Sequence, residues 1–131
     1  MRNKLTFSVS AIMLVLFLLL GSTQTQAQYR TSVWEKSAKL TNKPLWLGTD
    51  TERGSAFGNN KLYVVSRKYV ANVYTVDANT GDSTGALNVT GVTGGTFALS
   101  DVEVADDGAI YAANVTTNAL TSAFKIYRWA N

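Results

Sequence analysis

The chain has 131 residues, 12 basic and 9 acidic side chains, and no cysteine or histidine. A chain of this length forms one domain or part of one. The lack of cysteine excludes disulfides, thiol nucleophiles and cysteine zinc sites, and the lack of histidine excludes a Ser-His-Asp triad. With 46% hydrophobic and 16% charged residues, the composition indicates a folded protein and not a disordered one.

The N-terminus has the three-part pattern of a secretory signal peptide. Arg2 and Lys4 supply the positive start, residues 11–20 (AIMLVLFLLL) form an unbroken apolar run, and residues 21–28 (GSTQTQAQ) are small and polar. The apolar run is only about half the ~20 residues of a membrane-spanning helix, which favours cleavage over an uncleaved anchor. We therefore expect export to the periplasm, the outer surface or the extracellular space.

Thr25 and Ala27 are small residues of the kind that signal peptidase requires before its cut. We expect residues 1–27 to be the signal peptide and residues 28–131 to form the mature domain, with no permanent membrane span. Cleavage removes two of the basic residues, and those that remain are scattered along the chain. Because nucleic-acid binding needs a clustered basic face, we expect no nucleic-acid partner.

The mature region predicts an all-β fold of short strands. Six segments are rich in β-branched and aromatic side chains or alternate in polarity, as strands do. These segments are residues 61–67, 73–76, 85–92, 101–105, 109–115 and 124–129. Asn59-Asn60 and Asp106-Asp107-Gly108 supply the residue types of hairpin turns. No segment has a capped apolar period of 3.6 residues, so we expect no helices here.

An internal repeat indicates how the strands are grouped. Leu62-Tyr63 matches Ile110-Tyr111 at a spacing of 48 residues, and Val73 to Val76 match Ile126 to Trp129 at a spacing of 53. This period predicts about two β-propeller-like blades, with two packed hairpins of a sandwich as the alternative. Because blades bury their faces against neighbours, we expect the chain to be part of a larger propeller and, alone, to have low stability or to self-associate.

Five strings of the mature region carry a resemblance to known proteins: residues 46–54 (WLGTDTERG), 61–67 (KLYVVSR), 94–104 (GGTFALSDVEV), 107–108 (DG) and 124–129 (FKIYRW). They resemble one family of secreted Bacteroidota proteins. The family is catalogued as domain of unknown function 4623, and its longer members resemble propellers; some carry a C-terminal sorting domain for type IX secretion. The resemblance implies that this chain is an N-terminal fragment of such a protein, and it carries over no functional residues.

One turn has the alternating oxygen donors of a calcium loop. Asp77, Asn79 and Asp82 lie in the string DANTGD, and hard cations bind six to eight such oxygens. The loop lacks the distal bidentate Glu of an EF-hand, and the same residues form an ordinary turn between strands. We favour the turn and keep the three residues as a metal candidate; no motif indicates a cofactor.

The densest acidic group lies near the second hairpin. Asp101 and Glu103 are two residues apart and share one face of a strand, and paired carboxylates catalyse glycoside hydrolysis at suitable separations. An ordinary strand and turn explain the group more simply. The leading hypothesis is a non-enzymatic binding or scaffold module, with a glycan or another protein as its partner. The alternative is a fragment of a secreted lactonase- or glycosidase-like propeller enzyme that uses these two acids.

The tryptophan and tyrosine residues permit two interpretations. They could stack on a carbohydrate, or they could pack in the core. Tyr63, Tyr74, Tyr111 and Tyr127 fall at matching positions of the repeat, which favours packing.

Export gives the first testable prediction. Expression in a bacterial host with a Sec pathway is expected to yield a secreted product that begins at Gln28, because the peptidase cuts after Ala27. Intact-mass analysis of the exported protein measures this directly. An exported form that retains Met1 or Arg2 would contradict the prediction.

Overall fold

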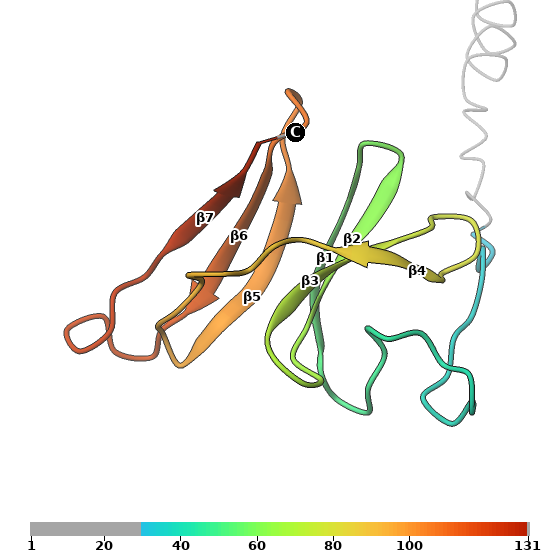
Figure 1. The fold of residues 1–131 in the computed structure, drawn as a ribbon, viewed down its shortest axis with the longest axis horizontal. Coiled ribbons are helices and arrows are strands. Elements are labelled where there is room, and N and C mark those ends of the chain that lie inside the picture. The colour runs from blue at the N-terminus through green and yellow to red at the C-terminus, as the bar shows by residue number, and fades with distance from the viewer. Residues whose placement is uncertain (1–29, 131) are drawn as a thin grey trace, which may run out of the picture. The chain divides into compact units, whose positions relative to one another are not determined.

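The computed structural model describes residues 30–130, which form seven strands and no helices (Figure 1). The predicted signal peptide lies outside these residues. No helix among the described residues is long and apolar enough to cross a membrane. The all-β prediction is confirmed, and the strands are β1 (Glu52–Gly58), β2 (Lys61–Ser66), β3 (Asn72–Val76), β4 (Ser83–Ala86), β5 (Phe97–Val104), β6 (Ile110–Val115) and β7 (Ile126–Trp129).

The strands form two antiparallel sheets in which sequence neighbours pair. The first sheet has the order β1-β2-β3-β4 and the second has the order β5-β6-β7. Both predicted hairpin turns are present. Asn59 and Asn60 have φ angles of 51° and 57°, the left-handed conformation that a two-residue hairpin needs and that asparagine tolerates. Gly108, with a φ of 80°, completes the turn between β5 and β6.

The strand pairing confirms the internal repeat. Tyr63 of β2 pairs with Thr75 of β3, and the matching Tyr111 of β6 pairs with Arg128 of β7. The agreement extends over four successive pairs in each sheet, so the two sheets have corresponding positions. In the first sheet these pairs are Leu62–Val76, Tyr63–Thr75, Val64–Tyr74 and Val65–Val73; in the second they are Ile110–Trp129, Tyr111–Arg128, Ala112–Tyr127 and Ala113–Ile126.

The largest differences from the predicted boundaries occur at two strands. The strand expected over residues 85–92 ends at Ala86, because Asn88 Oδ1 accepts the Thr90 N–H and Gly91 has a φ of 84°. Such a side-chain turn competes with the sheet for the backbone. The strand expected over residues 101–105 begins earlier, at Phe97, and the register shifts between Phe97 and Asp101.

The main core lies between the two sheets. Tyr63 is 4% exposed, and with Val65 and Val73 it packs in one cluster with Leu99 and Ile110. We call this side of the first sheet its inner face. The pairing of corresponding strands into two separate sheets agrees with two units; how such sheets would assemble into a propeller stays a prediction.

The opposite side of the first sheet is covered by the segment before β1. Trp46 is 6% exposed and packs in a second cluster with Val64 and Val76. Trp34 packs beside it, with ring centroids 6.2 Å apart in an edge-to-face arrangement. Residues 34–47 therefore occupy, on the first sheet, the place that a neighbouring blade would cover in a propeller.

Two indole N–H groups fix this segment to the turn between β3 and β4. Trp34 Nε1 donates to the Ala78 carbonyl at 2.9 Å, and Trp46 Nε1 donates to the Gly81 carbonyl at 3.2 Å. Gly81 has a φ of 74°, and a Cβ there would lie 2.7 Å from the Trp34 ring. Only glycine satisfies both the backbone conformation and the contact.

Removal of Trp46, the more deeply buried of the two tryptophans, tests the role of this segment. Trp46→Ala is expected to lower the free energy of unfolding by about 3–5 kcal/mol, because it leaves a cavity between the segment and the first sheet. Denaturant unfolding measures the change. Val33→Ala is the control, since Val33 is 78% exposed; equal effects of the two substitutions would contradict the assigned role of Trp46.

Glu52 gives a second prediction for stability. Its burial raises the pKa, but the Gly48 N–H and the Thr51 hydroxyl, which both donate to Oε1, lower it, and the net pKa is below 4.5. A carboxyl with a lowered pKa stabilises the fold above its unfolded-state pKa of about 4.3, and this contribution is lost as the pH falls through the folded pKa.

The thermal midpoint of the native chain is therefore expected to fall more steeply, as the pH drops below about 4.3, than that of Glu52→Gln. Thermal unfolding followed by circular dichroism measures both curves. Asp106→Asn, at an exposed turn, is the control. Parallel curves for the native chain and Glu52→Gln would contradict the prediction.

Candidate functional site

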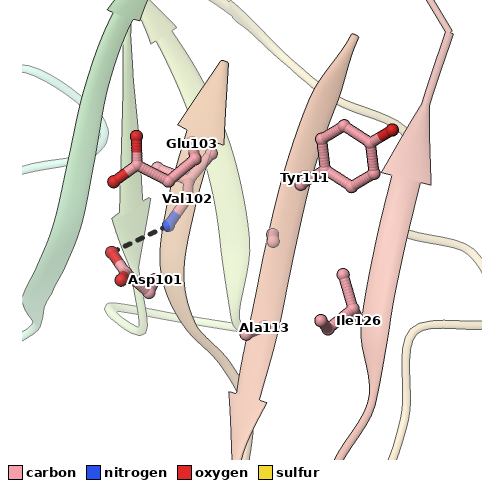
Figure 2. A pocket seen from close by; sticks show the side chains of 7 residues that line it. Asp101, Val102, Glu103, Tyr111, Ala113 and Ile126 are labelled. Carbon is pink, nitrogen blue, oxygen red and sulfur yellow. Dashed lines mark hydrogen bonds between the residues drawn. The ribbon is translucent and has the colours of Figure 1, made fainter. Parts of the chain in front are cut away.

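The second sheet has one side that the described residues leave uncovered, and we call it the open face. A hollow of about 160 Å³ lies on it. Two rows of paired residues cross this face: Asp101–Ala113–Ile126 and Glu103–Tyr111–Arg128. Figure 2 shows both carboxylates on β5, with Tyr111 and Ile126 on β6 and β7.

Successive side chains of β5 point to opposite sides of the sheet, and this alternation places both acids on the open face. Val102 is buried in the core, so Asp101 and Glu103 on either side of it point away from the core and are exposed. Asp101 Oδ1 also accepts the Val102 N–H at 3.0 Å. The sequence prediction that Asp101 and Glu103 share one strand face is confirmed, and both line the hollow.

One basic group lies at the β7 end of the same face. Arg128 Nε donates to the Tyr111 hydroxyl at 3.1 Å, and its guanidinium carbon lies 5.8 Å from the centre of the Tyr111 ring. The guanidinium also pairs with Asp107 at 3.6 Å. Within residues 30–130 neither Asp101 nor Glu103 forms an ion pair. The open face therefore has an acidic side on β5, an apolar centre and a basic side on β7.

The size of the hollow limits what the open face can bind. Small-molecule sites have volumes of about 300–1,000 Å³ and enclose most of the ligand, whereas this hollow has about 160 Å³. Ile126 beside it is 63% exposed. This geometry suits contact with a broad surface better than enclosure of a substrate.

The candidate calcium ligands lie in the turn that holds the N-terminal segment. Asp77 Oδ1 accepts the Asn79 and Thr80 N–H groups at 2.8 and 2.9 Å. Asp82 Oδ1 pairs with Lys36 Nζ at 2.9 Å, and this contact lowers the pKa of Asp82. Across the described part of the chain, no three Asp, Glu, His or Cys side chains cluster as metal ligands would. The oxygens of Asp77 and Asp82 thus serve the turn and its attachment to Lys36.

The aromatic side chains divide between core and open face. Tyr63 is buried between the sheets, whereas the matching Tyr111 lies on the open face. Trp129 Nε1 donates to the Asn88 carbonyl at 2.7 Å, and the Tyr127 hydroxyl donates to the Thr93 carbonyl at 2.6 Å. These two contacts fix the connection between the sheets.

Ile126 was not among the predicted site residues. Its match to the buried Val73 in the repeat is the sequence signal that could have identified it.

Comparison with known proteins identifies a family but no activity. A family model described as Domain of unknown function (DUF4623) matches residues 25–131. A solved structure of a DUF4623 family protein from Bacteroides eggerthii is similar, with a TM-score of 0.51 and 24% sequence identity; the match covers 62% of this chain and 20% of that one. No curated protein matches the chain. The resemblance found in the sequence is thereby confirmed, and the chain belongs to the DUF4623 family.

Proposed function

We propose that the chain is an exported, non-enzymatic binding or scaffold module that presents the open face to a protein partner. One observation carries the proposal: the open face corresponds, position by position, to the inner face of the first sheet. Tyr111, Ala113 and Ile126 correspond to Tyr63, Val65 and Val73, which form part of the core between the sheets.

The polarity of the open face supports a protein partner over a glycan. Glycan sites commonly use aromatic side chains as stacking platforms, and the hollow has one aromatic residue, Tyr111, whose hydroxyl is engaged by Arg128. An apolar centre with charged sides is the usual pattern of a protein interface. The N-terminal signal pattern supports a location in the periplasm, on the outer surface or outside the cell.

The enzymatic alternative has one observation in its favour. Asp101 and Glu103 reach the same hollow, as the two carboxylates of a glycoside hydrolase or a lactonase-like enzyme would. Against it stand the hollow's small volume and its exposure. The alternative predicts hydrolysis that depends on both carboxylates.

Photo-crosslinking tests the binding proposal. A benzophenone amino acid at position 126, on the open face, is expected to give discrete protein adducts in the exporting host. The same group at Leu120, which is 97% exposed in a loop, is the control and is expected to give none. Mass spectrometry of the adducts identifies the partner. Equal or absent crosslinking at the two positions would overturn the proposal.

An assay with aryl glycosides and lactones tests the alternative. The native chain is expected to show no turnover above background. A rate that disappears in the Asp101→Asn/Glu103→Gln double variant and persists in Asp107→Asn would instead establish the enzymatic alternative.

A further inference from the structure

We propose that the partner on the open face is a second copy of this chain, placed by a two-fold axis that runs along β6. The inference rests on the proposed function, because it names the partner of the same face. Three features carry it: the distribution of charge across the face, the side-chain sizes at its centre, and the coverage of the opposite end of the molecule.

The distribution of charge on the open face favours one orientation of the dimer. In a face-to-face dimer with its axis along β6, β5 of one copy lies across β7 of the other. Glu103 then faces the partner's Arg128, and the pair occurs twice, while the exposed Asp101 lies across from the partner's Ile126 at the edge of the face. An in-plane axis perpendicular to the strands would instead place β5 across β5, with Asp101 and Glu103 of both copies against one another. Like charges in contact disfavour that arrangement, whereas the first is complementary.

Arg128 is available for a second carboxylate. Its side chain is 51% exposed, and its pair with Asp107 is long, at 3.6 Å; exposed pairs of this kind contribute little. A guanidinium has five N–H donors in a fixed plane. The same guanidinium can therefore hold Tyr111 on its own face and the partner's Glu103 across the interface.

The side-chain sizes at the centre are self-complementary. Ala113 lies between the larger Tyr111 and Ile126 and lines the hollow. With the axis along β6, Ala113 faces Ala113, and the hollows of the two copies meet. The Tyr111 rings and Ile126 side chains of both copies then have space to pack into the combined depression. Alternating large and small residues permit this interdigitation.

The covered side of the first sheet disfavours head-to-tail stacking of one sheet on another. Head-to-tail stacking would require the open face to meet the side of the first sheet that bears Val64 and Val76, but Trp34 and Trp46 cover it. Contact between two open faces uses the same surface on both copies, and such contacts close into a dimer.

Sedimentation equilibrium of the exported protein, over a concentration series, tests the proposal. We expect a reversible dimer. Ile126→Glu is expected to weaken dimerisation at least about tenfold, because it places a charge in the apolar centre. Leu120→Glu is the matched control and is expected to leave the dimer unchanged. Circular dichroism verifies that each variant is folded.

Charge reversal keeps the test decisive if Ile126→Glu fails to fold. Glu103→Arg and Arg128→Glu are each expected to weaken the dimer about tenfold or more, and the double variant is expected to recover most of that loss. A monomer at every concentration, or a double variant no tighter than the single ones, would overturn the second-copy inference.

The two proposals fail in different ways. Adducts at position 126 with a different protein, together with a monomeric chain, would overturn the second-copy inference and leave the binding module standing. Adducts of twice the chain mass would support both. Absence of adducts at position 126 would overturn the binding module itself.

Discussion

The first sheet has buried apolar residues on both sides, and the need to cover both determines the arrangement of the elements around it. In the first sheet, neighbouring β2 residues point to opposite sides: Tyr63 and Val65 to one, Val64 to the other. The second sheet covers the first of these sides and the segment over residues 34–47 covers the second. At ~25 cal/mol per Å² of apolar surface, leaving either side in water would consume much of the roughly 5–15 kcal/mol by which domains are stable. The order segment, first sheet, second sheet follows from this balance.

The N-terminal segment acts as a cap for one end of the repeat. Repeat proteins need terminal elements that bury the last apolar face and present a polar outer side. Here the cap has no regular secondary structure, so the backbone pairing of a sheet is replaced by tryptophan side chains. Trp34 and Trp46 supply large apolar area, and their indole N–H groups bond to backbone carbonyls in the β3–β4 turn. In the same turn Asp82 pairs with Lys36 of the cap, and Asp77 accepts the N–H groups of Asn79 and Thr80.

Sequence reasoning succeeded where the determinants are local. The Asn59-Asn60 turn, the repeat of Leu62-Tyr63 and the shared strand face of Asp101 and Glu103 depend on residues close in sequence, and each is present in the structure. The cap could not be predicted, because the contacts of Trp34 with the β3–β4 turn span 44 residues and have no periodic signal. Identification of the open face requires both the sequence repeat and the three-dimensional structure. The repeat gives the correspondence of Ile126 with Val73, but only the arrangement of the sheets shows that Val73 is buried and Ile126 is exposed.

The differences between the two corresponding faces indicate what kind of contact the open face makes. Ala56 and Glu103 occupy the same place, each paired with the tyrosine of its repeat. The inner face has a small apolar residue there and excludes water from its core, whereas the open face has a carboxylate at the same position. A buried carboxylate without a partner charge would oppose permanent packing of the intramolecular kind. With Arg128 at the opposite side of the face, the exposed carboxylate is compatible with water and agrees with the reversible contact that we propose. The repeat has thus produced two faces with the same strand pairing, one closed in the core and one that the described residues leave uncovered.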